Sequence, residues 1–166
     1  MKTNPAPSVV DTAFVIASVA HAGQVYGDNG TPYVDHLAAV VDVLGAFTGD
    51  DDLIAAAWLH DAVEDTTITT SDIEAACGSR VSNLVWACSG VGRNRETRNA
   101  AIQAKISAYP PAAIVKLADR IANVEQSAAA SSHRAMYLAE NEAFEALVRQ
   151  HVPEAMWERL EKAFVQ

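Results

Sequence analysis

The sequence predicts an all-α fold, a single domain of about eight helices. Half of the 166 residues are apolar, alanine supplies much of that half, and only 7% are aromatic. Long stretches also lack Pro and Gly, and this combination favours close-packed helices over sheets. A chain of this length is long enough to bury a real core as one domain.

The first two helices are delimited by apolar spacing and by glycines. Apolar side chains recur at helical intervals over residues 11–22, and Gly23 follows. A second helix is expected over residues 36–44, with Gly45 after it. Between them, residues 27–32 are rich in Gly, Asp and Asn, so we expect an irregular segment at the rim of a site.

Three helices are expected in the middle of the chain. Acidic residues at Asp51 and Asp52 favour a helix start there because they complement the helix dipole, and the apolar run extends the helix to residue 63. The pattern Ser71–Glu74 fits a capping box that opens a short helix ending at Gly78. Residues 80–88 form the next helix, before a Gly-rich loop.

The last part of the chain is helical to its end. Pro110 and Pro111 break a helix that starts at Arg95. Pro153 suits the first turn of the final helix, where its missing N–H costs nothing. The expected helices are residues 95–109, 112–130, 132–150 and 153–164. The domain therefore has a core over about residues 9–127, followed by C-terminal helices over residues 132–164.

Composition narrows the class of protein. Cys77 and Cys88 suit neither a disulfide framework nor a zinc ribbon, so we expect reduced core cysteines in a cytoplasmic protein. No segment is long and apolar enough for a membrane span or a signal peptide. The net charge of −9 argues against binding nucleic acid. The sequence leaves the oligomeric state open.

Charge is divided along the chain. No Lys or Arg lies between Lys2 and Arg80, whereas twelve Asp and Glu fall there. Seven basic residues then follow within about forty positions, from Arg80 to Arg120. One interpretation is solvated helix surface; the other is an acidic, metal-binding half that faces a basic, phosphate-binding half.

A cluster of ionisable residues predicts a metal site. The segment from His60 to Asp65 places a histidine and three acids at the end of an apolar run, where buried charge requires compensation. His36 and Asp119 add an imidazole and a carboxylate from other helices. Two imidazoles and two carboxylates, from His36, His60, Asp61 and Asp119, suit one six-coordinate ion such as Mn²⁺ or Fe²⁺, whereas structural zinc more often recruits thiolates.

Further polar residues share faces with these candidates. Glu64 lies four residues after His60, and Asp65 lies four after Asp61, so either carboxylate could accept a proton or serve as an acidic helix terminus. Asn123 lies four residues after Asp119 and could offer its amide to a sugar hydroxyl or phosphate. The expected substrate contacts are Asn123, Tyr33, Arg93, Arg95, Arg98, Lys116, Arg120 and Tyr137.

Four segments resemble one known family. They are AHAGQ at 20–24, GTPYVDH at 30–36, LHDAVEDT at 59–66 and VKLADRIAN at 115–123. In this order the chain is similar to the HD-type hydrolase domain of the RelA/SpoT family, and by layout to the small alarmone hydrolases, which include the metazoan SpoT homologue. The resemblance covers roughly two thirds of the chain.

The resemblance implies an all-helical, Mn²⁺-dependent enzyme of the stringent response that removes the 3′-pyrophosphate from (p)ppGpp. It implies that His36, His60, Asp61 and Asp119 hold the metal and that Glu64 and Asp65 activate water. It also implies that Asn123 contacts the nucleotide. Because the chain ends where a synthetase domain would begin, the resemblance implies hydrolysis without synthesis.

The chain departs from the family pattern at the base-binding position. Family members usually carry an Arg that stacks on guanine, often followed by Lys, nine residues before the first metal-binding His; here Gly27 and Asp28 stand there. Guanine specificity is therefore open, and (p)ppApp is a second candidate substrate. A phosphatase acting on NADPH or a 5′-nucleotide is an alternative activity. A nucleotide-binding module without turnover is the alternative from a different class.

Overall fold

The first helix shows how local side chains start an element. Helix α1 (Val9–Ala20) begins after Ser8, whose hydroxyl accepts a hydrogen bond from the Asp11 N–H, while the Asp11 carboxylate accepts one from the Ser8 N–H. This reciprocal capping box satisfies two N–H groups that a helix start leaves unpaired. The helix therefore begins two residues before the start expected from the sequence.

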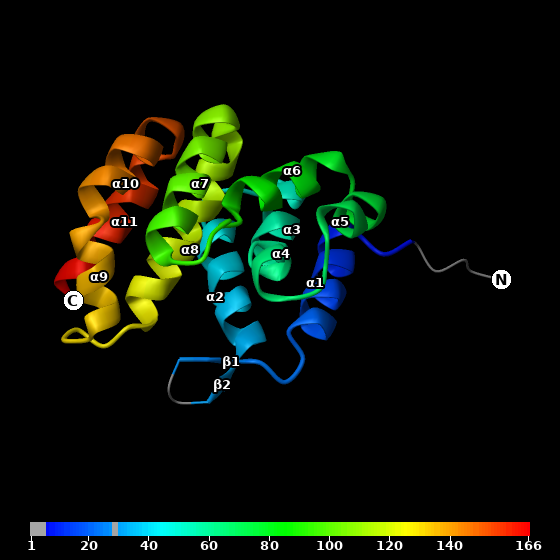
Figure 1. The fold of residues 1–166 in the computed structure, drawn as a ribbon, viewed down its shortest axis with the longest axis horizontal. Coiled ribbons are helices and arrows are strands. Elements are labelled where there is room, and N and C mark those ends of the chain that lie inside the picture. The colour runs from blue at the N-terminus through cyan, green and yellow to red at the C-terminus, as the bar shows by residue number, and fades with distance from the viewer. Residues whose placement is uncertain (1–5, 28–29) are drawn as a thin grey trace.

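The computed structural model describes residues 6–27 and 30–166. Within them it contains eleven α-helices, two short 3₁₀ helices and one two-stranded ribbon (Figure 1). After α1 the elements are β1 (Val25–Tyr26), β2 (Thr31–Pro32), α2 (Tyr33–Gly45), α3 (Asp51–Leu59), α4 (Ala62–Asp65), α5 (Thr70–Cys77), α6 (Ser79–Cys88), α7 (Arg95–Ala108), η1 (Pro110–Ala112), α8 (Ala113–Gln126), α9 (Ser132–Ala139), α10 (Asn141–Val148), η2 (Arg149–His151) and α11 (Glu154–Val165).

Helices α2 and α8 pack against each other in the middle of the molecule. Helices α1, α3, α5 and α6 lie on one side of this pair, and α9, α10 and α11 lie on the other (Figure 1). The apolar core is continuous and includes the fully buried Leu37, Leu59, Leu117, Ile121 and Trp157. The all-α prediction is confirmed, and the central helix pair is the frame on which the polar site is built.

The structure corrects three helix boundaries. The helix expected over residues 51–63 ends at Leu59, and α4 begins at Ala62, so His60 and Asp61 form a break. The helix expected over residues 132–150 divides at Glu140, and α8 ends at Gln126 rather than near residue 130. The two divisions account for the eleven α-helices of the described residues, two more than the nine helical ranges expected from the sequence. Both breaks carry a charged residue that pairs with another helix.

The predicted capping box at Ser71–Glu74 was placed two residues late. Thr69 is the N-cap of α5: its hydroxyl accepts from the Asp72 N–H, and the Asp72 carboxylate accepts from the Thr69 N–H. Both patterns fit the same sequence rule, and the structure uses the earlier one. Pro153 likewise serves as the N-cap of α11 rather than its first helical residue.

Thr31 and Pro32, at the end of the segment predicted to be irregular, form one strand of a short antiparallel ribbon. Val25 pairs with Pro32, and Tyr26 pairs with Thr31. Gly27 and Gly30 have φ values of +67° and +73°, in the left-handed region that favours glycine, and they let the chain reverse there. The ribbon lies beside the start of α2 (Figure 1). Because Tyr26 of the ribbon stacks on His36, the ribbon forms a rim next to that residue.

The state of the two cysteines and the lengths of the helices can be compared with the expectations from composition. Cys77 and Cys88 are both free and buried, as expected. Burial raises the pKa of the Cys88 thiol to about 12, so it remains protonated in the core. In the described part of the chain, no helix has the length and hydropathy that crossing a bilayer requires.

Removing the cap of α3 should destabilise the fold. Asp50 accepts from the Asp52 and Leu53 N–H groups and pairs with Arg80. We expect Asp50→Ala to lower the free energy of unfolding by about 0.5–2 kcal/mol, the usual cost of losing an N-cap. Asp51→Ala is the control, since Asp51 is exposed in the same turn. Equal urea midpoints for the two variants would contradict this role.

The same cap makes stability depend on pH. The hydrogen bonds from Arg80 lower the pKa of Asp50 to about 2. Because this carboxyl is more acidic in the folded state, its contribution is fully present above the pKa of an unfolded Asp, near 4. It is then lost as the pH falls through about 2. The stability difference between wild type and Asp50→Ala should therefore shrink across this window.

Candidate metal and anion site

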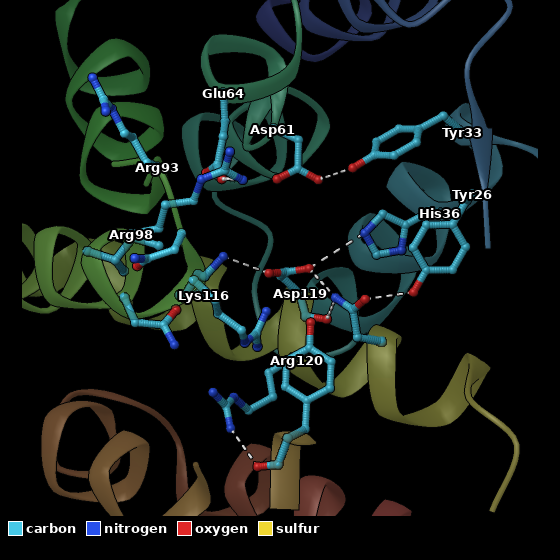
Figure 2. Close-up of a pocket in the computed structure, with 16 residues that line it drawn as sticks. Tyr26, Tyr33, His36, Asp61, Glu64, Arg93, Arg98, Lys116, Asp119 and Arg120 are labelled. Atoms are coloured by element: carbon cyan, nitrogen blue, oxygen red, sulfur yellow. Dashed lines mark hydrogen bonds and ion pairs between the residues drawn. The ribbon is translucent and has the colours of Figure 1, made fainter. Parts of the chain in front are cut away.

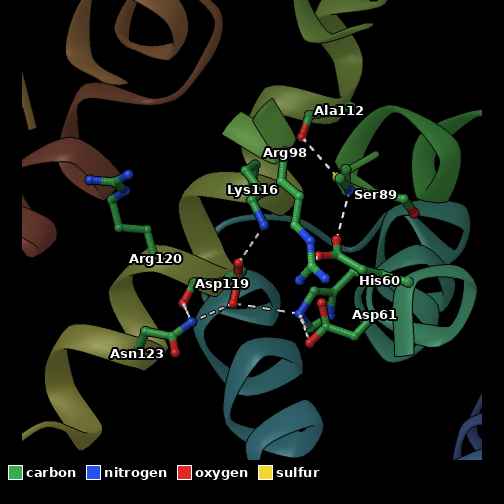
Figure 3. Close-up of polar contacts among 12 residues, drawn as sticks. His60, Asp61, Ser89, Arg98, Ala112, Lys116, Asp119, Arg120 and Asn123 are labelled. Carbon is green, nitrogen blue, oxygen red and sulfur yellow. Dashed lines mark hydrogen bonds and ion pairs between the residues drawn. The ribbon is translucent and has the colours of Figure 1, made fainter. Parts of the chain in front are cut away.

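Three separate elements bring the predicted metal donors together. His36 lies in the first turn of α2, His60 and Asp61 form the break between α3 and α4, and Asp119 lies on α8. Because α2 and α3 both pack on α8, the side chains converge at one point. Figure 2 shows His36, Asp61 and Asp119 there, and Figure 3 shows His60 beside Asp61 and Asp119. One donor atom from each of His36, His60 and Asp119 lies within 4.8 Å of the others.

The two histidines present the same ring nitrogen to this point. His60 Nδ1 lies 2.8 Å from the Ala57 carbonyl, so it carries the proton and donates. His36 Nδ1 lies 3.0 Å from Gln126 Oε1 and donates in the same way. Each Nε2 therefore keeps its lone pair when the ring is neutral, and each lies 3.5 Å from Asp119 Oδ1. Partners on the far nitrogen that fix the ring in this way are typical of metal-binding histidines.

The buried His60 Nε2 supports a cation at this point. The residue is 1% exposed, and Nε2 has no partner with hydrogen-bonding geometry, although Asp61 Oδ2 lies at 3.1 Å. A buried polar atom without such a partner is costly, and a metal ion would satisfy it. The nitrogen and oxygen donors, without a thiolate, suit a borderline or hard divalent ion. The residues present therefore fit the predicted metal.

Each carboxylate also has a partner outside the donor group. Lys116 Nζ donates to Asp119 Oδ2 at 2.8 Å, and Asn123 Nδ2 donates to Asp119 Oδ1 at 2.5 Å. The Tyr33 hydroxyl donates to Asp61 Oδ2 at 2.7 Å. These contacts fix the orientations of Asp119 and Asp61, as groups behind a metal ligand do. Tyr33 and Lys116, predicted to contact substrate, thus also hold two predicted metal ligands.

The electrostatics reflect this concentration of acids. Burial lowers the pKa of His60, but Asp61 and Asp119 overcome that effect and raise it to about 10. Burial raises the pKa of Asp119, but Lys116 and the two histidines hold it well below its ordinary value. Burial and the Asp61 carboxylate raise the pKa of Tyr33, which keeps its hydroxyl a donor. Positive charge is therefore favoured where the donors meet.

A cavity of about 390 Å³ opens over the donors (Figure 2). The predicted metal donors His36, Asp61 and Asp119 line it together with five basic residues. That acidic and basic residues line one cavity supports the second interpretation of the charge distribution, a metal-binding part that faces a phosphate-binding part, which stays a prediction. The predicted substrate contacts that line it are Tyr33, Arg93, Arg95, Arg98, Lys116, Arg120, Asn123 and Tyr137.

Most of the basic residues are paired with acids. Arg98 pairs with Glu64 at 3.1 Å, and both Arg95 and Arg120 pair with Glu140. Lys116 pairs with Asp119. Among the residues that the structure describes, Arg93 forms no ion pair, so it is the lining cation without a competing carboxylate.

The two predicted catalytic acids differ in position. Glu64 lines the cavity, and its carboxylate accepts from the Gly90 N–H at 2.7 Å and from Arg98. A Cβ on Gly90 would lie 2.8 Å from Arg98 Cβ and 3.1 Å from Glu64 Oε2, so glycine permits this close approach. Asp65 is exposed, accepts from Tyr33 at 3.3 Å and is not among the lining residues.

Tyr137 and Arg120 belong to a packed group. The guanidinium carbons of Arg95 and Arg120 lie 5.1 and 5.0 Å from the centre of the Tyr137 ring. Arg120 is 7% exposed and donates to the Tyr137 carbonyl. Glu140, at the break between α9 and α10, forms ion pairs with both arginines. Because Tyr137 of α9 lines the cavity, the C-terminal helices complete one wall of it.

Sequence reasoning missed Tyr26 and Gln126. Tyr26 stacks on His36, and Gln126 accepts a hydrogen bond from it. Tyr26 lies just before the segment predicted to be irregular, and Gln126 is the last residue of α8. Gln126 is one turn after Asn123, so helical spacing could have indicated it. Tyr26 gave no such signal. Gly27, next to it, lines a neighbouring cavity with Tyr26, while Asp28 lies outside the described residues.

The chain is similar in sequence to a known family and to several known enzymes. The family described as HD domain matches residues 13–144. A guanosine-3′,5′-bis(diphosphate) 3′-pyrophosphohydrolase of Vibrio cholerae is 37% identical over 83 residues, which are 50% of this chain and 12% of that protein. A probable enzyme of the same name in Synechocystis is 34% identical over 120 residues, 68% of this chain and 16% of that protein. The chain thus spans less than a fifth of the length of either relative.

A solved structure shares the fold. It is that of a metazoan ortholog of SpoT that hydrolyzes ppGpp, with a TM-score of 0.82 and 24% sequence identity. The match covers 99% of this chain and 98% of that one. The C-terminal helices, which carry Glu140 and Tyr137, therefore belong to the shared architecture.

Removing donors should abolish metal binding. We expect His36→Ala and Asp119→Ala each to lose bound Mn²⁺, because three donor atoms at one point become two. His151→Ala is the control, since His151 is exposed and does not line the cavity. Metal content after dialysis, measured by mass spectrometry, reports the result. Stoichiometric metal in a folded Asp119→Ala variant would show that the site lies elsewhere.

Proposed function

Because the chain belongs to the HD-domain family, we propose that it is a metal-dependent hydrolase that removes the 3′-pyrophosphate from a purine nucleotide alarmone, (p)ppGpp or (p)ppApp. The observation that carries the proposal is one cavity in which a His/Asp donor group faces a cluster of arginines and lysine. Such a cavity suits a substrate that carries several phosphates. The names of the matched pyrophosphohydrolases support the same reaction.

In this proposal His36, His60, Asp61 and Asp119 hold one divalent ion, with Mn²⁺ preferred and Fe²⁺ or another divalent ion as alternatives. A divalent ion there would supply Lewis-acid chemistry to a phosphoryl group. Tyr33 and Lys116 keep the two carboxylates oriented, as their hydrogen bonds to Asp61 and Asp119 support.

Glu64 is the proposed proton acceptor. Its carboxylate lines the cavity and is held by Gly90 and Arg98. Water adds its oxygen to the phosphorus attached to the 3′-oxygen, and its proton passes to Glu64. The bond between that phosphorus and the 3′-oxygen breaks, the 3′-oxygen takes a proton from solvent to become the hydroxyl of the nucleotide, and pyrophosphate is the other product. Asp65 supports this step through Tyr33, to which both it and Asp61 are hydrogen bonded.

The five basic residues that line the cavity form what we call the basic wall: Arg93, Arg95, Arg98, Lys116 and Arg120. In this proposal the basic wall binds the phosphates. Arg93 is available directly, whereas a phosphate would have to compete with Glu64 for Arg98 and with Glu140 for Arg95. Arginine suits this role because its planar fork matches phosphate oxygens. Exchange of Arg98 from Glu64 to a phosphate would also free the proposed proton acceptor when substrate is present.

We place this activity in the cytoplasm, with a small nucleotide as partner and no nucleic acid. Both cysteines are free, as a reducing compartment favours. The net charge of −9 disfavours a polyanionic partner, whereas a local basic wall suits a small anion.

Turnover of three nucleotides tests the function. We expect the Mn²⁺-loaded protein to release pyrophosphate from ppGpp or ppApp, because the cavity joins metal donors to a phosphate-binding wall. Orthophosphate released from NADPH or a 5′-nucleotide would instead establish the alternative phosphatase. Tight nucleotide binding without any product would establish a binding module. Full activity after exhaustive EDTA dialysis would contradict metal dependence.

The same turnover measurement should also be made on the variant Glu64→Gln. It keeps the size of the side chain and should retain metal while losing about 10²–10⁴-fold in kcat, the usual cost of one acid–base group. Glu74→Gln is the control on another helix, outside the cavity. A Glu64→Gln variant that turns over at the parent rate would remove Glu64 from the mechanism.

Base preference follows from Gly27. A stacked Arg contributes on the order of 0.5–2 kcal/mol through cation–π attraction, and glycine supplies none of it. We therefore expect ppApp to compete with ppGpp, and Gly27→Arg to shift the ratio of their kcat/KM values toward ppGpp. A wild-type preference for ppGpp of a hundredfold or more (roughly 2.7 kcal/mol) would show that guanine is read elsewhere.

The control for this change is Gly27→Gln. Gly27 has a φ of +67°, so any side chain there costs about 1–2 kcal/mol in backbone strain. Gln imposes the same strain without the charge. A shift toward ppGpp that appears equally in both variants would therefore be an effect of the backbone rather than of stacking.

A further inference from the structure

Tyr26 lies directly against the proposed metal donors although it comes from the ribbon. Its ring stacks on the His36 imidazole with centroids 4.2 Å apart and an angle of 1° between the planes. The ring therefore limits His36 on one face, while Gln126 holds its Nδ1. Figure 2 shows the two rings together at one side of the cavity.

The hydroxyl of the same tyrosine reaches a second donor through an amide. It donates to Asn123 Oδ1 at 2.6 Å. Asn123 Nδ2 in turn donates to Asp119 Oδ1 at 2.5 Å and to the Asp119 carbonyl at 2.9 Å. A single residue of the ribbon thus contacts His36 with its ring and Asp119 through Asn123.

The direction of this chain of hydrogen bonds is determined by its two ends. The Asp119 carboxylate can only accept, so Asn123 must turn its NH₂ toward it. The amide oxygen then faces Tyr26, whose hydroxyl donates. If the amide turned over, its oxygen would lie against the carboxylate and its NH₂ would lose that acceptor. The tyrosine hydroxyl therefore stabilises the one amide orientation that supports Asp119.

We propose that Tyr26 is a positioning residue that holds His36 and, through Asn123, Asp119 in the geometry needed to bind the metal. The inference rests on the proposed metal site. It ties the β1–β2 ribbon to metal affinity, and it gives Asn123 a different role from the one the sequence suggested. Asn123 is 6% exposed and both of its amide atoms are engaged, so it acts on Asp119 rather than on a sugar hydroxyl or phosphate.

Metal affinity of the full chain tests the proposal. Titration calorimetry with Mn²⁺ would compare wild type, Tyr26→Phe, Tyr26→Leu, Asn123→Ala and the double variant Tyr26→Phe/Asn123→Ala. Loss of a group behind a metal ligand typically costs 10–100-fold in affinity. We expect a loss in this range for Tyr26→Phe, which keeps the ring, and a larger one for Tyr26→Leu, which loses both contacts.

The double variant distinguishes a chain of contacts from separate effects. If Tyr26 acts on Asp119 through Asn123, then Tyr26→Phe should add nothing once Asn123 is alanine. Tyr109→Phe is the matched control, because Tyr109 ends α7 and does not line the cavity. Thermal melting of the metal-free proteins shows whether each variant folds.

The outcomes separate cleanly. Unchanged Mn²⁺ affinity in a folded Tyr26→Phe, or losses that multiply in the double variant, would overturn the proposal. A wild type that binds no divalent metal would overturn it together with the metal site. Wild type that binds Mn²⁺ but hydrolyses no alarmone would remove the proposed activity, while the affinity series would still decide the role of Tyr26.

Discussion

The buried carboxylate of Asp119 is the constraint on which the site depends. It is 7% exposed at the centre of the molecule, where an isolated charge would be costly to desolvate. Its two oxygens have different partners. Oδ2 accepts a hydrogen bond from the Lys116 ammonium, whereas Oδ1 accepts one from Asn123 and lies 3.5 Å from Nε2 of both His36 and His60. Packing of α2 and α3 against α8 brings those histidines to it, so the fold and the site require each other.

Two breaks between helices bring polar residues to the cavity. Successive residues of a continuous helix point about 100° apart. The break between α3 and α4 lets both His60 and Asp61 contribute, with Asp61 Oδ2 at 3.1 Å from His60 Nε2. The break at Glu140 serves the opposite wall, because it places a carboxylate where two arginines from α7 and α8 meet.

Acids balance most of the charge of the basic wall. Four of its five cations pair with a carboxylate, and Glu140 serves two of them. These pairs keep long side chains ordered around a cavity that would otherwise concentrate positive charge. A phosphate group entering the cavity would exchange one anion for another, which limits the cost of desolvating the arginines. In the proposed function, selectivity would then depend on how many phosphates can make this exchange together.

The sequence by itself determined the helical class and the HD-type motif order, and it predicted the candidate donor residues. Those features are local or set by residue type: alanine-rich periodicity indicates helices, and imidazole and carboxylate groups at these intervals indicate a metal. Only the tertiary structure decided where the helices break, and that Tyr26, Gln126 and Glu140 support the site. Their contacts join residues up to 97 positions apart, and no pattern along the chain encodes such a distance. Packing of α2, α3 and the C-terminal helices on α8 supplies it.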